Sequence, residues 1–139
     1  MGHFYRSQHE LIFVFKNGKQ EKPFHGDRSN VWNYPGMNSF AMENRDELLA
    51  SHPTVKSLPL VKDAILDASD EGDLVLDLFG GSGTTLIAAE ETNRKCCMME
   101  LEPKYCDVII RRWQQLTGQI AVHENGNTFE EISSERLAA

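Results

Sequence analysis

Leu74-Val75-Leu76-Asp77-Leu78-Phe79-Gly80-Gly81-Ser82-Gly83-Thr84-Thr85 is the stretch of sequence on which the fold depends. It opens with a short apolar run, which predicts a parallel strand buried on both faces. Its glycines allow the backbone to turn sharply and to approach a ligand closely. Thr84 begins a predicted helix, whose first N–H groups lack intrahelical partners and carry a partial positive charge. The stretch therefore predicts a ligand-binding loop between a strand and a helix.

Regular elements are predicted on both sides of this loop. Upstream, Ser57 can cap a helix and Pro59 fits its first turn. Downstream, the apolar pattern predicts a helix, a strand and a helix over residues 84–93, 95–101 and 103–118. The order helix, strand, helix, strand, helix predicts an α/β fold with a parallel sheet.

The flanking regions have weaker patterns. The apolar run Leu11–Phe15 predicts a buried strand, and a long polar loop follows it up to residue 51. Gln119 to Val122 reads as one more short strand. We therefore divide the chain into an N-terminal strand and loop, an α/β core and a loosely held tail, over residues 1–51, 52–122 and 123–139.

Two common ligands of glycine loops do not suit this one. A phosphate-binding P-loop needs a lysine near its end, and no lysine lies between Asp77 and Thr92. A dinucleotide loop needs a third glycine, and Leu86 occupies that position. Asp77 would also repel a pyrophosphate.

S-adenosylmethionine fits the loop better, because it carries an ammonium, a sulfonium and a carboxylate. Asp77 can meet the ammonium, while the helix N–H groups and the hydroxyls of Ser82, Thr84 and Thr85 can meet the carboxylate. Glu100 ends the second predicted strand, 23 residues after Asp77. That spacing is close to the roughly 20 residues expected for an acid that binds a ribose diol. Glu100 alone would be read as a solvated strand-end acid; together with the loop, the ribose role is favoured.

Composition sets outer limits on the function. The chain has 139 residues and a net charge of −7, and it contains no apolar run of about 18 residues that would predict a membrane span. Three cysteines, two of them adjacent, indicate neither a disulfide framework nor a metal site, so we expect a reduced, cytoplasmic protein. The acidic balance argues against nucleic-acid binding by bulk charge. A basic cluster between Lys16 and Arg28 could contact phosphates, although a solvated loop is the more common case.

These motifs together resemble the β-order DNA amino-methyltransferases, which methylate N6 of adenine or N4 of cytosine. The resemblance rests on His52–Ser57, Asp77–Thr85 and Glu100, with further similarity at Phe4–Glu10 and Arg28–Trp32. It implies a Rossmann-like fold, S-adenosylmethionine as cofactor and DNA as partner. The cofactor-binding residues that it implies are His52, Thr54, Lys56, Asp77, Phe79, Gly80, Gly81, Ser82, Gly83, Thr84, Thr85 and Glu100.

The sequence departs from the family pattern in one important place. The family's catalytic element contains two adjacent prolines followed by an aromatic residue, which stacks on the flipped base. No two prolines are adjacent in this sequence, so we assign no catalytic residue and no metal ligand. The resemblance implies the C-terminal part of the fold, without the catalytic loop and the central strands. We therefore expect an open sheet edge that a second copy or a partner chain covers.

Three functions remain open at this stage. The first is the cofactor-binding half of a DNA amino-methyltransferase. The second is a non-catalytic module that binds S-adenosylmethionine or only associates. The third, a dehydrogenase-type nucleotide-binding unit, is disfavoured by Leu86.

Overall fold

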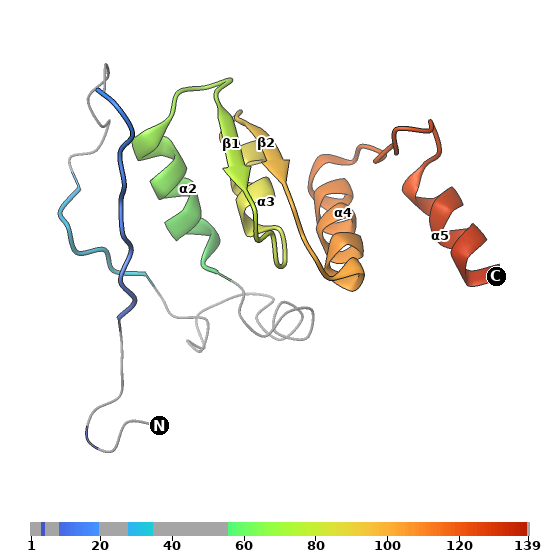
Figure 1. The fold of residues 1–139 in the computed structure, drawn as a ribbon, viewed down its shortest axis with the longest axis horizontal. Coiled ribbons are helices and arrows are strands. Elements are labelled where there is room, and N and C mark those ends of the chain that lie inside the picture. The colour runs from blue at the N-terminus through green and yellow to red at the C-terminus, as the bar shows by residue number, and fades with distance from the viewer. Residues whose placement is uncertain (1–3, 5–8, 20–27, 35–55, 139) are drawn as a thin grey trace.

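The computed structural model describes residues 4, 9–19, 28–34 and 56–138. A helix, a strand, a helix, a strand and two helices follow one another along the chain (Figure 1). Their bounds are α2 Leu58–Ala68, β1 Leu74–Asp77, α3 Thr84–Glu91, β2 Lys95–Met98, α4 Pro103–Thr117 and α5 Phe129–Ala138. In the described residues, no helix has the length and apolar character needed to cross a membrane.

The two strands form a parallel pair, with Leu74 opposite Lys95 and Asp77 opposite Met98. Helix α3 connects them, as a parallel pair requires. Both strands therefore end at the same edge of the sheet, where the loop between β1 and α3 also begins. The predicted α/β fold with a parallel sheet is confirmed, with a sheet of two strands in the described part of the chain.

The core lies on one face of this sheet. Ile65 of α2 packs with Ala88 and Ala89 of α3, and Val75 and Cys96 of the strands pack against this cluster. The two alanines have no exposed surface, because their small side chains let α3 lie close to its neighbours. Helix α2 and helix α3 therefore hold the inner face of the strand pair.

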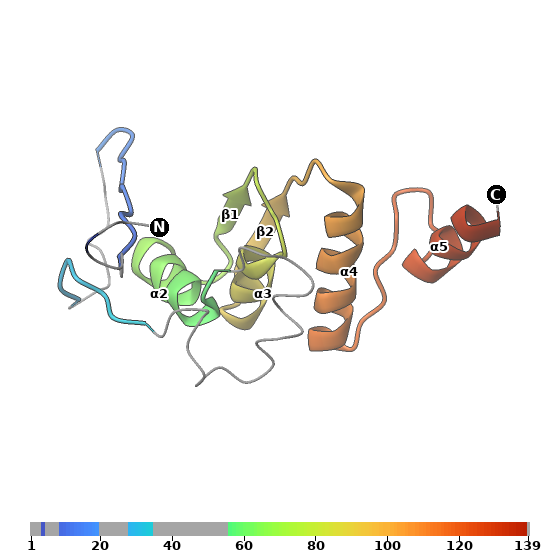
Figure 2. The ribbon, with the colours of Figure 1, turned by 90° about the horizontal axis from the view of Figure 1, so that it is seen from below.

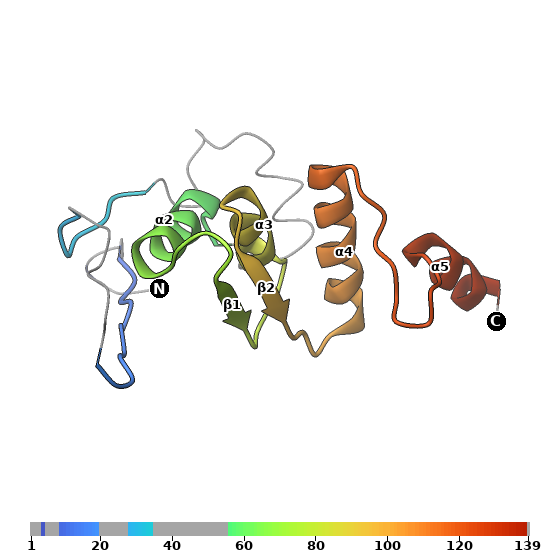
Figure 3. The same cartoon turned by 90° about the horizontal axis from the view of Figure 1, so that it is seen from above.

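The outer face of the sheet is open, which corrects the expectation of a strand buried on both faces. Leu74 and Leu76 are each 64% exposed, whereas Val75 and Asp77, which alternate with them, are partly buried. Figures 2 and 3 show α3 on one side of the strands, and none of the described helices on the other. The strand alternates in burial because helices cover only one of its faces.

The expectation of a buried strand at Leu11–Phe15 is wrong. The segment has no strand hydrogen bonding, and its five side chains are between 60% and 89% exposed. An apolar run becomes a strand only when a neighbouring strand pairs with it. The described sheet consists of β1 and β2 and does not include this segment.

The C-terminal region is more ordered than the tail predicted over 123–139. Helix α5 occupies most of it, while the short strand expected at Gln119–Val122 is reduced to one bridge between Val122 and Thr128. Helix α5 lies beyond α4, on the side away from the strands (Figure 1). The division of the chain into three parts stays a prediction.

Helix ends follow the sequence signals, with one exception. Helix α4 begins at Pro103 and ends at Gly118, which adopts a left-handed φ of 68° as a C-terminal glycine does. Pro59 lies in the first turn of α2, but Ser57 makes no side-chain capping bond. Ser57 is therefore the N-cap residue, as predicted, but its side chain does not satisfy the first N–H groups of the helix.

Candidate functional site

The candidate site begins where β1 ends, at Asp77. The Asp77 side chain is partly buried, and its Oδ1 accepts a hydrogen bond from the backbone N–H of Phe79 at 2.9 Å. Its charge also reaches the next strand: burial raises the pKa of the Cys96 thiol, and the Asp77 carboxylate raises it further. Asp77 therefore shapes the start of the loop while its negative charge stays at the strand end.

The glycine loop is fastened to the end of β2. The N–H of Gly80 donates to the Met99 carbonyl at 2.8 Å, and the N–H of Met99 donates to the Asp77 carbonyl at 2.9 Å. A Cβ on Gly80 would lie only 2.6 Å from the Met98 sulfur. A side chain at position 80 would displace the Met98 side chain, because the loop backbone lies directly against β2.

Glu100 closes the site from the other strand. Its Oε2 accepts the N–H of Gly81 at 2.6 Å, and its Oε1 accepts the N–H of Glu102 at 2.9 Å. The carboxylate thus joins the glycine loop to the start of α4.

The loop has one exposed apolar side chain and two buried hydroxyl groups. Phe79 is 88% exposed, so its ring is open to a ligand. Ser82 and Thr84 are buried, and their hydroxyl oxygens lie 3.4 Å apart, while Thr85 is partly buried. The expected contact of these hydroxyls with a ligand carboxylate stays a prediction.

The upstream part of the predicted site is described only at Lys56. Its Nζ lies 2.8 Å from a carboxylate oxygen of Glu10, and both side chains are exposed. His52 and Thr54 lie outside the described residues. Their assignment to the cofactor pocket stays a prediction.

Two residues of α4 support the loop and were not among the predicted site residues. Ile109 is buried against Gly80 and Gly83, and the Arg112 guanidinium donates to the Ser82 carbonyl. A signal was present in the sequence, because Arg112 lies three residues after Ile109 and so falls on the same side of the predicted helix. A charged residue on an inward face needs a partner, and here it is the loop.

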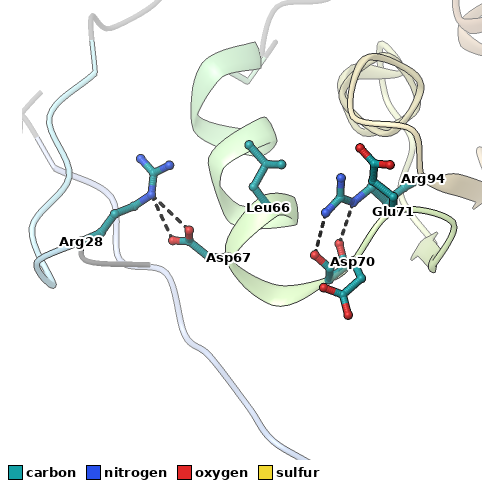
Figure 4. A pocket seen from close by; sticks show the side chains of 7 residues that line it. Arg28, Leu66, Asp67, Asp70, Glu71 and Arg94 are labelled. Atoms are coloured by element: carbon teal, nitrogen blue, oxygen red, sulfur yellow. Dashed lines mark hydrogen bonds and ion pairs between the residues drawn. The ribbon is translucent and has the colours of Figure 1, made fainter. Parts of the chain in front are cut away.

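A separate pocket of about 390 Å³ lies at the opposite end of the sheet (Figure 4). Apart from Arg28, its lining residues lie in the last turn of α2, in the turn that follows it or directly before β2; they are Arg28, Leu66, Asp67, Ser69, Asp70, Glu71 and Arg94. Arg94 donates to the Ser69 carbonyl at 2.6 Å, and Arg28 donates to Asp67 at 3.2 Å. Ligands of open α/β sheets bind at the carboxyl ends of the strands, so this pocket is not the predicted site.

Comparison with known proteins identifies relatives over most of the chain. A family model described as DNA methylase matches residues 2–111. The orphan methyltransferase M.BamHII of Bacillus amyloliquefaciens is 35% identical over 125 residues, which are 88% of this chain and 44% of that protein. The DNA adenine methyltransferase YhdJ of Escherichia coli (strain K12) is 36% identical over 106 residues, covering 76% of this chain and 34% of that protein.

The chain thus spans less than half the length of these two relatives. Among solved structures, the complex of M1.HpyAVI with SAM is 29% identical and aligns with a TM-score of 0.47. That alignment covers 65% of this chain and 42% of the other.

Proposed function

Because this chain belongs to the DNA methylase family, we propose that its glycine loop and the ends of β1 and β2 bind S-adenosylmethionine. The observation that carries the proposal is the position of two acids at one edge of a parallel sheet. Asp77 is the last residue of β1, and Glu100 lies two residues after Met98, which is the last residue of β2. The loop between them is fastened to both strand ends.

The chemistry of these groups fits the donor molecule. The Asp77 carboxylate would hold the ammonium, the Glu100 carboxylate would accept from the ribose hydroxyls, and the exposed Phe79 ring would contact the adenine. The first N–H groups of α3 would face the donor's carboxylate. S-adenosylmethionine supplies an activated methyl group for transfer to a nucleophilic nitrogen.

The proposed acceptor is an exocyclic amino nitrogen of adenine or cytosine in DNA. The chain's residues would position the donor, since proximity and alignment account for much of the rate of such a transfer. No two prolines are adjacent in the sequence, so we propose that the element that holds the target base lies outside these 139 residues. We expect no methyl transfer to DNA from this chain alone, and transfer after such an element is added.

We also propose that the open face of the sheet is covered by a second copy or by a partner chain. Leu74 and Leu76 on that face are each 64% exposed. Parallel sheets normally have both faces covered.

We further propose a reducing, cytoplasmic location for the protein. The three cysteines, which are free thiols, support this location.

Titration calorimetry with S-adenosylmethionine tests the proposed function. Asp77→Asn keeps an oxygen that can accept from Phe79 N–H and removes the charge that would pair with the donor's ammonium. We expect its affinity for S-adenosylmethionine to fall about 10- to 100-fold, the usual effect of losing a charge-assisted hydrogen bond.

Asp73→Asn is the matched control, because Asp73 precedes β1 at the opposite end of the sheet. It should bind the donor as the wild type does. Binding of NAD in place of S-adenosylmethionine would support the nucleotide-binding alternative. Unchanged affinity in Asp77→Asn would remove the ammonium assignment. Donor binding without methyl transfer, even after the missing element is added, would favour a non-catalytic module.

A further inference from the structure

Helix α4 packs closely against the glycine loop, so that a side chain added at either of two loop glycines would press on Ile109. A Cβ on Gly83 would lie 3.0 Å from Cγ1 of Ile109, and a Cβ on Gly80 would lie 3.2 Å from its Cδ1. Ile109 itself is buried. The Ile109 side chain limits how closely α4 approaches the glycine loop, but it does not determine the orientation of the peptide groups in the loop.

Arg112 makes the polar contact of this helix with the loop. It lies three residues after Ile109, on the same side of α4, and its Nη1 donates to the carbonyl of Ser82. The side chain is partly buried, and burial lowers the pKa of the guanidinium, which nevertheless stays charged at neutral pH. The cation thus loses part of its hydration to reach a main-chain carbonyl of the loop.

The peptide that Arg112 holds is the one that leads into α3. The Ser82 carbonyl and the Gly83 N–H belong to the same peptide group, and that N–H donates to the Gly80 carbonyl at 2.8 Å. Gly83 is the N-cap residue of α3, with a left-handed φ of 81°. Fixing both ends of this peptide group fixes the direction in which the helix begins, and with it the direction of its first N–H groups.

We propose that Arg112 is a positioning residue for the methyl donor, which turns the Ser82–Gly83 peptide so that the N-terminal N–H groups of α3 face the donor's carboxylate. The proposal rests on the proposed function, because it takes the glycine loop as the donor site. Arg112 acts through the backbone of the loop and is not assigned a contact with the donor. The Glu100 carboxylate complements this contact, because it accepts a hydrogen bond from the N–H of Gly81, the residue before Ser82.

The test compares donor binding by calorimetry in Arg112→Met, Arg112→Lys and Arg111→Met. Arg112→Met keeps an unbranched, flexible side chain without a hydrogen-bond donor, and we expect its affinity for S-adenosylmethionine to fall about tenfold. Arg112→Lys keeps one charged donor for the single carbonyl, so it should recover most of that loss. Arg111→Met is the control, because Arg111 is exposed on the same helix and contacts the Phe129 ring of α5.

Amide NMR separates positioning from a general loss of structure. In Arg112→Met the resonances of Gly83 and Thr84 should shift while those of α2 stay in place, and Arg112→Lys should return them toward the wild-type positions. Wild-type affinity in Arg112→Met, or an equal loss in Arg111→Met, would overturn the inference. If the wild-type chain does not bind S-adenosylmethionine, the proposed function itself fails, and the assignment of a donor to this loop fails with it.

Discussion

Gly83 and Gly72 share a left-handed backbone but differ in their surroundings. Their φ angles are 81° and 82°, yet a Cβ on Gly72 would meet nothing within 4 Å, whereas one on Gly83 would meet Ile109 at 3.0 Å. We expect Gly72→Ala to lower the free energy of unfolding by about 1–2 kcal/mol through backbone strain. Gly83→Ala should lower the free energy of unfolding by about 1–3 kcal/mol more than Gly72→Ala, because Ile109 must also move. Urea unfolding measures both, and equal losses would show that α4 does not press on the loop.

Glu131 shows how a single acid can make one helix end sensitive to pH. Its Oε2 accepts the Thr128 N–H at 2.7 Å and the Thr128 hydroxyl at 2.9 Å, and the N–H of Glu131 donates back to that hydroxyl at 3.3 Å. The bond from the Thr128 N–H, followed by that from its hydroxyl, lowers the pKa of Glu131. This reciprocal arrangement is a capping box at the start of α5.

We expect the stability that this box adds to α5 to depend on pH in one direction. Because the folded pKa is the lower one, the contribution is complete above the unfolded value of about 4.3 and is lost as the pH falls through the folded pKa. Glu131→Gln should remove this dependence, and Glu135→Gln, elsewhere in α5, should keep it. Amide exchange in the first turn of α5 measures the effect at each pH. A wild type and a Glu131→Gln variant with the same pH profile would contradict it.

Elements with signals at both of their ends were the ones that the sequence predicted well. Helix α4 begins on Pro103 and ends on Gly118, and the β1–loop–α3 unit follows directly from its apolar run and its glycines. These signals are local, because they describe what the backbone can do at one residue. The positions of Asp77 and Glu100 at one edge followed in turn from two parallel strands.

Features that depend on distant partners were not predictable in the same way. Leu11–Phe15 has the composition of a strand but no described strand pairs with it, and Leu76 is exposed because nothing described lies over that face. Helix α5 is a different case, since the Thr128 and Glu131 spacing of a capping box is visible in the sequence. Its polar composition gives no apolar stripe, so the sequence predicts a tail in this region.

Arg28 and Tyr34 attach the segment 28–34 to helix α2, and the Tyr34 hydroxyl donates to an Asp63 carboxylate oxygen. Arg28 makes two hydrogen bonds to Asp63, at 2.7 and 2.8 Å, and a third to Asp67 at 3.2 Å, and its guanidinium lies 5.7 Å from the centre of the Trp32 ring. Its side chain is 38% exposed, so solvent screens these ion pairs and we expect its removal to change the overall unfolding free energy little. The effect should instead be local to the segment.

Arg28→Lys tests this attachment, because lysine cannot form the paired bonds to Asp63. In a Trp113→Phe background, where Trp32 is the single tryptophan, the emission of Trp32 should shift toward that of a solvated indole. Lys56→Ala, which removes the exposed pair with Glu10, should leave the emission unchanged. An unchanged spectrum in Arg28→Lys would mean that other contacts hold segment 28–34 on α2.

The whole molecule has an apolar face that its described helices do not cover. Leu74 and Leu76 of β1 are each 64% exposed, and α2 and α3 lie on one side of the strand pair (Figures 2 and 3). Burying one leucine contributes about 2 kcal/mol, so covering this face offers a substantial gain. The edge of β1 away from β2 also presents main-chain groups that another strand could pair with.

Sedimentation equilibrium over a range of chain concentrations tests whether this face associates. We expect the purified wild type to self-associate, and the double variant Leu74→Lys with Leu76→Lys to be largely monomeric, because lysine ammonium groups resist burial in an apolar interface. Ile120→Lys is the matched control: Ile120 is also 64% exposed but lies after α4, away from the sheet, so its variant should associate like the wild type. A wild type that stays a monodisperse monomer, with strongly protected core amides in hydrogen exchange, would show that two strands and their helices form a stable unit without a cover.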